Sequence, residues 1–297
     1  MISILIAVHN EEKFIRETVE SIKNQTYPDW EVIIVDDGST DKTYDILEEL
    51  SKQDKRIKIA HINKSGKNAA WNFAAKMAQG EWFMPFAGDD KLPPSILEQW
   101  HNIIKKENPD KKVIVQSKIQ MFAEGKYFKK YNGLIIPKKK GEVCNSGGVY
   151  LASRSVLKDM FPIPGQLPNE DGWSKLYFNY FLDKRLKYPE IACLYRIHDG
   201  NSINKEAEFK DFTELYHKRA QAVQLFIERY KERLDKKVII RLETDCRLEE
   251  FRYSGKGFRI LMLKGVDLKG KVRAICFSNK LFYNIKVAFN NIFMGRG

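Results

Sequence analysis

The chain has 297 residues, of which 43% are hydrophobic and 12% aromatic, and its formal net charge is +12 at pH 7. This is enough apolar sequence for one large α/β domain with an appendage. Its four cysteines stand far apart and form no CxxC pair, which argues against both a disulfide framework and a cysteine zinc site.

The positive charge is concentrated in the C-terminal part of the chain. Residues 229–297 hold 17 Lys and Arg against 7 Asp and Glu, a net charge of +10, whereas residues 1–228 carry only +2. A nucleic-acid-binding protein would carry its charge on the main domain, so we disfavour that class. A basic tail suits an anionic surface such as lipid head groups, or is a solvated face. Without a signal-peptide pattern or an apolar run of roughly 20 residues, we expect a cytoplasmic protein, soluble or peripheral on the inner face of the membrane.

The first hundred residues alternate strands with amphipathic helices. Apolar runs at 2–8, 30–35, 56–62 and 82–87 predict strands, three of them buried on both faces. The segments between them place their apolar residues on one helical face. This alternation, which continues to about residue 106, predicts a mostly parallel sheet with helical crossovers.

Two of these predicted strands end in paired acids. Asp36 and Asp37 follow the second strand, and Asp89 and Asp90 follow the fourth. Ligands bind beyond the carboxyl ends of strands in such sheets, so four carboxylates are expected at one edge. Oxygen ligands suit a hard divalent cation, which predicts a metal held against nucleotide phosphates. The simpler interpretation of Gly-Asp-Asp is a turn.

The pattern changes after residue 106. Residues 113–121 and 127–136 predict irregular strands, and a Pro/Gly-rich loop then leads to Glu170 and Asp171 at the start of a helix. These acids either stabilise the helix N-terminus or supply a general base. A strand at 187–194 precedes Arg196 and His198, a combination that suits an anionic phosphate.

The remainder of the chain is predicted to be helical and amphipathic. In residues 257–294, aromatic and aliphatic side chains are interleaved with Lys and Arg. This composition is typical of a helix that lies in a membrane interface. A terminal helix pair packed on the domain is an equal alternative.

Taken together, these motifs resemble family 2 glycosyltransferases of the GT-A fold. The matching segments and residues are 4–11, 21–27, 35–41, Asn63, Gly66, Asn72, 88–90, 170–171, Arg196, His198 and Ser202. The resemblance covers residues 1 to about 205 and implies a GT-A domain there, with a Rossmann-like, mostly parallel sheet. Within it, residues 1–106 would form a nucleotide-binding half and 107–205 an acceptor-binding half, followed by a basic helical extension over 206–297.

The resemblance also implies roles for individual residues. Asp90 would ligate Mn²⁺ or Mg²⁺ on the diphosphate, and Asp171 would be the general base with Glu170 as its neighbour. The donor-binding residues would be Ala7, His9, Glu11, Asp37, Lys64, Asp89, Asp90, Arg196 and His198.

Two positions depart from the family pattern. Trp71 stands where an arginine commonly precedes Asn72, which leaves Lys64 or Lys67 as a possible substitute. Ala87 stands where an acid commonly lies two residues before Asp89, so any metal would be held by fewer side chains.

The expected activity is inverting transfer of a sugar from a nucleoside-diphosphate sugar, with uridine as the expected base, to a hydroxyl of a glycan or lipid-linked glycan. Two alternatives stay open. Transfer to a polyprenyl phosphate would need no base, because that acceptor is already anionic. A sugar nucleotidyltransferase would need a Gly-rich basic loop after the first strand, where this chain has the acidic segment 9–12.

Overall fold

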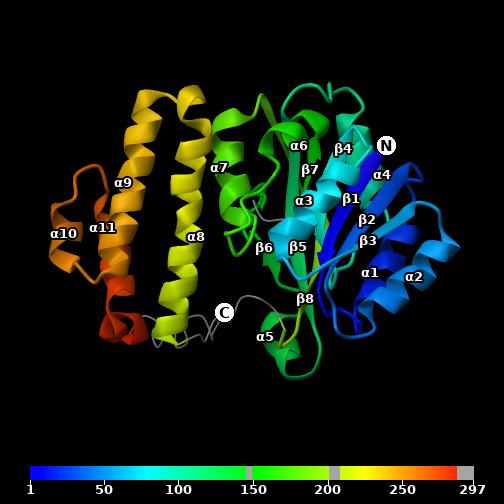
Figure 1. Cartoon of the computed structure of the whole chain (residues 1–297), viewed down its shortest axis with the longest axis horizontal. Coiled ribbons are helices and arrows are strands. Elements are labelled where there is room, and N and C mark those ends of the chain that lie inside the picture. Colours follow the sequence, from blue (N-terminus) through cyan, green and yellow to red (C-terminus); the bar gives the residue numbers. More distant parts are fainter. Residues whose placement is uncertain (145–148, 201–207, 286–297) are drawn as a thin grey trace. The chain divides into compact units, whose positions relative to one another are not determined.

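The computed structural model describes residues 1–144, 149–200 and 208–285 (Figure 1), and Ser202 lies outside these ranges. The chain divides into two compact units. The first comprises Met1–Gly165 and Tyr177–Asp199, and the second comprises Gln166–Leu176 and Gly200–Gly297. The segment 166–176 therefore groups with the C-terminal helices in this division, and the domain boundary near residue 205 stays a prediction. The functional halves 1–106 and 107–205 stay a prediction.

The first unit is built on one eight-stranded sheet with the order β3-β2-β1-β4-β7-β5-β6, in which β8 also pairs with β5 (Figure 1). Strands β1 to β4 are mutually parallel, as are β5 and β8, whereas β7 runs antiparallel to both β4 and β5. The strands are β1 (Ile2–Val8), β2 (Trp30–Asp37), β3 (Ile57–Ile62), β4 (Trp82–Ala87), β5 (Val113–Ala123), β6 (Ile135–Ile136), β7 (Tyr150–Ser153) and β8 (Lys184–Ile197). The predicted α/β fold with a mostly parallel sheet is confirmed.

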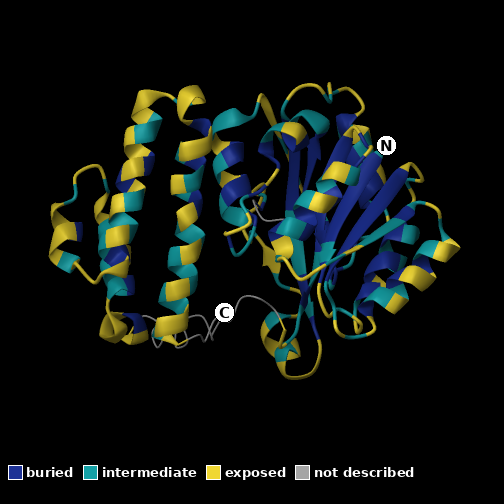
Figure 2. Cartoon of the chain, viewed as in Figure 1, coloured by how far each residue is buried: buried dark blue, intermediate teal, exposed yellow. Residues whose placement is uncertain are grey.

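Helices cover both faces of this sheet. Helices α1 (Ile15–Lys23), α2 (Thr43–Gln53) and α4 (Ile96–Ile104) share one buried apolar cluster with alternate residues of β1, β2 and β4. Helix α3 (Lys67–Met77) contacts β1 and β2 outside that cluster, and α6 (Arg154–Met160) contacts β4 and β7. The central strands are almost wholly buried (Figure 2), which explains their unbroken apolar runs.

The segment 127–136 is not the strand that its sequence predicted. It begins with a 3-10 turn, η1 (Gly125–Tyr127), and the short helix α5 (Phe128–Tyr131), and only β6 joins the sheet. The amide of Asn132 donates to the carbonyl of Phe128, and Gly133 turns the chain with φ +79°. A local turn with a left-handed glycine therefore replaces the strand.

The second unit is helical. Helix α9 (Lys236–Tyr253) packs against α8 (Phe209–Tyr230), α10 (Gly257–Met262) and α11 (Leu268–Ser278), and a 3-10 turn, η2 (Lys231–Arg233), joins α8 to α9. Asp235 and Asp267 cap α9 and α11 by accepting backbone N–H groups. The predicted helical, basic C-terminal extension is confirmed. None of the helices in the described residues is long and apolar enough to cross a bilayer.

One helix contributes to both units. Helix α7 (Asp171–Phe181) begins in the second unit and ends in the first. Within the second unit, Trp173 lies with its ring centroid 5.5 Å from that of Phe226 on α8.

Candidate active site

The carboxyl ends of β1, β2, β4 and β8 lie at the same edge of the sheet (Figure 1). This edge places Glu11, Asp37, Asp89 and His198 at or just beyond the ends of these four strands. It is the edge at which open α/β sheets bind their ligands.

The loop after β1 is tied to the loop after β2. Asn10 has a φ of +58°, and its side-chain oxygen accepts the amide of Thr40 at 2.8 Å. The amide of Glu11 donates to the Thr43 hydroxyl at 2.7 Å. These contacts hold Glu11 half-buried near Asp89, and burial, reinforced by the Asp89 charge, raises the pKa of Glu11 to about 7. His9 is exposed and Ala7 is partly exposed beside them.

The buried carboxylate of Asp37 organises the loop after β3. It accepts the amides of Ser65 at 2.7 Å and Gly66 at 3.0 Å, and the Lys64 ammonium lies 2.9 Å from it. Burial acts to raise the pKa of Asp37, but these donors outweigh it and hold the pKa below its usual value. Gly38 makes this approach possible, because a Cβ there would lie 2.8 Å from the Lys64 nitrogen. Asp37 and Lys64 are thus brought together as one charged pair.

Asp89 meets His198 across the ends of β4 and β8. Its Oδ2 lies 3.0 Å from Nε2 of the imidazole, and both side chains keep some solvent exposure. The preceding Gly88 is packed so closely that a Cβ there would come within 2.5 Å of Val8 Cγ1. Thr18 fixes the same turn by donating to the Gly88 carbonyl at 2.9 Å.

Asp90 points away from this pair and into the protein. Its carboxylate is 3% exposed, accepts the amide of Arg196 at 2.8 Å, and lies 3.5 Å from the Cys193 sulfur. Burial, reinforced by the Asp89 charge, holds the pKa of Asp90 well above its usual range. The observed contacts therefore make Asp90 an anchor for the end of β8 and offer little support for the metal-ligand role given to it by resemblance.

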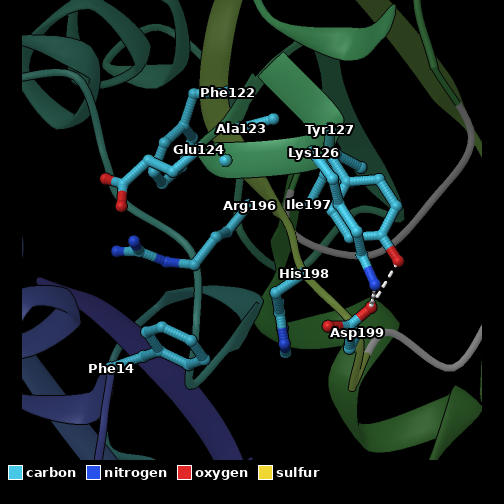
Figure 3. A pocket seen from close by; sticks show the side chains of 11 residues that line it. Phe14, Phe122, Ala123, Glu124, Lys126, Tyr127, Arg196, Ile197, His198 and Asp199 are labelled. Atoms are coloured by element: carbon cyan, nitrogen blue, oxygen red, sulfur yellow. Dashed lines mark hydrogen bonds and ion pairs between the residues drawn. The ribbon is translucent and has the colours of Figure 1, made fainter.

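Arg196 lies between two aromatic rings. Its guanidinium carbon is 4.6 Å from the ring centroids of both Phe14 and Phe122 (Figure 3), and it donates to Glu17 at 2.7 Å. Glu17 also accepts the Lys91 ammonium at 2.5 Å. The sequence alone does not single out Phe14, Phe122 or Glu17, because their partners lie far away along the chain.

A cavity of about 530 Å³ opens beside Arg196 and His198. Residues 122–127 line its other side, and Figure 3 shows Lys126 and Tyr127 directed toward Asp199. The Tyr127 hydroxyl donates to Asp199 at 2.5 Å, and the Lys126 ammonium lies 2.6 Å from the same oxygen. The aromatic and charged lining can accommodate a polar ring and a charged group.

Glu170 and Asp171 belong to the second unit. Glu170 is 5% exposed, and its carbonyl accepts the amide of Ser174 in the first turn of α7. Asp171 is partly exposed, and the Asn169 side-chain amide donates to its Oδ2 at 3.2 Å. The role of Asp171 as a general base stays a prediction.

The sheet edge offers few side chains that could ligate a divalent cation. Over the described ranges 1–144, 149–200 and 208–285, no three His, Cys, Asp or Glu side chains are grouped as a metal site. Asp89 and His198 nevertheless offer one carboxylate and one imidazole within 3.0 Å of each other. Two protein ligands fit a cation that completes its coordination with diphosphate oxygens.

Comparisons with known proteins agree with this architecture. The family model described as glycosyl transferase family 2 matches residues 3–161. The chain is 28% identical over 273 residues to EpsH of Bacillus subtilis (strain 168), which carries a provisional glycosyltransferase name, covering 86% of this chain and 78% of EpsH.

Two solved structures share the fold. The crystal structure of S. aureus TarS residues 1–349 in complex with UDP-GlcNAc matches with a TM-score of 0.61 at 19% identity, over 95% of this chain and 80% of that one. The mannosyltransferase PcManGT of Pyrobaculum calidifontis, in complex with GDP-Man and Mn²⁺, matches with a TM-score of 0.51 at 16% identity, over 98% of this chain and 87% of that one.

Proposed function

Because this chain belongs to glycosyltransferase family 2, we propose that it transfers a sugar from a uridine-diphosphate sugar to a hydroxyl of a glycan or lipid-linked glycan, with inversion at the anomeric carbon. The proposal rests on the meeting of Asp89 and His198 at the sheet edge that also holds Asp37. The UDP-GlcNAc complex of TarS, which shares the fold, supports the choice of uridine.

The donor nucleotide would lie along the ends of β1 and β2. Ala7 and His9 would flank the base. Asp37 and Lys64, which lie together in the loop that Asp37 holds in place, would contact the base as well. Lys64 is half exposed, so its ammonium can also reach a phosphate without first leaving a buried site. This supports its use in place of the arginine that Trp71 replaces.

We assign the role of metal ligand to Asp89 in place of Asp90. Asp89 and His198 would hold the cation, because the carboxylate of Asp90 is buried against Arg196 and Cys193. A mixed oxygen and nitrogen donor set suits Mn²⁺ better than Mg²⁺, which prefers oxygen alone. When bound, such a cation stabilises the negative charge that develops on the departing diphosphate. The Mn²⁺ complex of PcManGT, which shares the fold, supports the choice of Mn²⁺ as the cation.

Asp171 would act on the acceptor. Its carboxylate would take the proton of the attacking hydroxyl as the new glycosidic bond forms. The Asn169 side-chain amide donates to its Oδ2 at 3.2 Å and would orient the carboxylate. Glu170 would support the start of α7. A single displacement assisted by one base on the face opposite the leaving group inverts the anomeric centre.

The purified chain should be titrated with UDP-sugars and GDP-sugars, with and without Mn²⁺, by calorimetry and thermal stabilisation. We expect Mn²⁺-dependent binding of uridine nucleotides, and NMR of the glycoside product should show the inverted configuration. A retained configuration, or the absence of nucleotide-sugar binding, would contradict the proposal. Consumption of a nucleoside triphosphate with a sugar phosphate would favour the nucleotidyltransferase instead.

A further inference from the structure

Helices α10 and α11 contact α9 through one side only. Ile260 on α10, and Ala274 and Phe277 on α11, are buried, and both helices contact α9 within the second unit. The Arg252 guanidinium on α9 donates to the carbonyl of Phe277 at 3.1 Å, which fixes the end of α11. These contacts define an inward side and leave the opposite side uncovered in the described residues.

The uncovered side is apolar at helical spacing. Phe258 and Met262 lie four residues apart on α10 and are 75% and 67% exposed, and Leu268 and Val272 lie four apart on α11 and are 74% and 51% exposed. Residues four apart share a helix face. We call the exposed apolar side chains of these two helices the α10–α11 face: Phe258, Leu261, Met262, Leu268 and Val272. Three more exposed apolar residues, Leu281, Phe282 and Ile285, follow α11 in the chain. Figure 2 shows how much of α10 and α11 is exposed.

Cations surround this face. Residues 254–285 contain seven Lys and Arg and a single acid, Asp267, which caps α11. Lys256, Lys264 and Lys269 are all exposed. Exposed apolar side chains surrounded by long basic ones form the composition that inserts into a lipid interface, because the apolar groups leave water while the ammonium groups stay among the head groups.

We propose that the α10–α11 face binds an anionic lipid surface, with its apolar side chains in the interfacial layer and its lysines on the lipid phosphates. The charge distinguishes this partner from another copy of the chain, because two identical faces would place cations against cations. Exposed aromatic and aliphatic groups would stay in contact with water on a nucleic-acid backbone and so would contribute little binding free energy. Among acyl chains they leave water, which is favourable. The enzyme would thus be held where a lipid-linked acceptor is found.

Sedimentation of the full chain with phosphatidylcholine vesicles, with and without phosphatidylglycerol, tests the proposal. We expect binding to the anionic vesicles only, weakened by salt. The triple variant Phe258→Ser, Met262→Ser, Leu268→Ser should weaken it at least about tenfold, since tenfold corresponds to about 1.4 kcal/mol. The variant Lys256→Glu, Lys264→Glu, Lys269→Glu should abolish the difference between the two vesicle types.

The matched control is Ile240→Ser on α9, which removes an apolar side chain that is 60% exposed but lies outside the face. It should bind vesicles like the parent. Circular dichroism and UDP-sugar hydrolysis should be unchanged in every variant, which separates this result from a failure of fold or activity. Unchanged vesicle binding by the triple variants would overturn the proposal. So would a dimer, detected by ultracentrifugation, that the triple Ser variant dissociates.

Discussion

Nε2 of His198 lies 3.0 Å from Oδ2 of Asp89, although 109 residues separate them along the chain. The next residue, Asp90, makes this possible by accepting the amide of Arg196, while Lys91 and Leu194 form a β-bridge beside it. Two adjacent acids therefore have different surroundings. Asp90 is buried and joins β4 to the end of β8, whereas Asp89 remains available at the sheet edge.

This division predicts opposite outcomes for Asp89→Ala and Asp90→Ala. Asp89→Ala should lower Mn²⁺-dependent affinity for UDP about 10- to 100-fold with little change in stability, because it removes a metal ligand at a partly exposed position. Asp90→Ala should lower the free energy of unfolding by about 1–3 kcal/mol, because it leaves the buried Arg196 amide without its acceptor. Calorimetry and urea denaturation measure the two effects.

His198→Ala serves as the second arm of that comparison. It should reproduce the loss of Mn²⁺ dependence seen with Asp89→Ala, because both side chains would hold the same ion. If Asp90→Ala alone abolished Mn²⁺ dependence while remaining as stable as the parent, the assignment to Asp89 would be wrong.

Asp171→Asn is expected to lower kcat by about 10²–10⁴-fold with the affinity for the donor unchanged, because an amide cannot take the acceptor proton. Transfer assays at saturating UDP-sugar, combined with donor binding measured separately, would show this. Glu170→Gln is the control, because it replaces the neighbouring acid with an amide of the same size. It should lower kcat far less than Asp171→Asn does. Activity that survives Asp171→Asn would instead favour a polyprenyl phosphate acceptor, which needs no base.

Gly88→Ala should destabilise the protein by about 1–3 kcal/mol and also weaken donor binding, because its Cβ would come within 2.5 Å of Val8 Cγ1 and displace the turn that bears Asp89. Gly165→Ala is the matched control, since a Cβ there meets nothing within 4 Å. Thermal unfolding and UDP binding should be measured for both variants. Equal Tm and equal UDP affinity for Gly88→Ala and Gly165→Ala would show that the turn tolerates a side chain.

The acid stability of the first unit should depend on Glu31. This carboxylate is 3% exposed and accepts the Lys58 ammonium and the Gln79 amide, both at 2.7 Å. Burial acts to raise the pKa of Glu31, but its partners outweigh burial and hold that pKa below the usual 4.5. Its contribution is therefore present above the unfolded-state pKa and is lost as the pH falls through the lower, folded-state pKa.

Glu31→Gln should consequently lower Tm at pH 7 and flatten the fall of Tm below about pH 4.5. Glu49→Gln is the control: Arg16 lowers the pKa of that carboxylate too, but on the surface, where solvent screens the pair. Thermal unfolding across the acid range should show a change for Glu31→Gln and almost none for Glu49→Gln. Parallel curves for Glu31→Gln and the parent would contradict this prediction.

The sequence by itself determined the alternation of strands and helices. Short apolar runs such as Ile2–Val8 are typical of strands in a sheet covered on both faces, and the segments between them have apolar residues at helical spacing. It also located the acids at strand ends, and its motifs indicated the family. It did not show which of Asp89 and Asp90 is buried, because adjacent residues have the same local sequence context.

Only the tertiary structure decided which of these acids is buried, since that depends on the end of β8, formed about a hundred residues later in the chain. The same holds for Glu17, whose partners Lys91 and Arg196 come from two other segments. At the C-terminal end, the sequence showed apolar and basic residues together. Packing on α9 then separated the buried Ile260 and Phe277 from the exposed Phe258 and Leu268, because a helix can bury only the side that faces its neighbour.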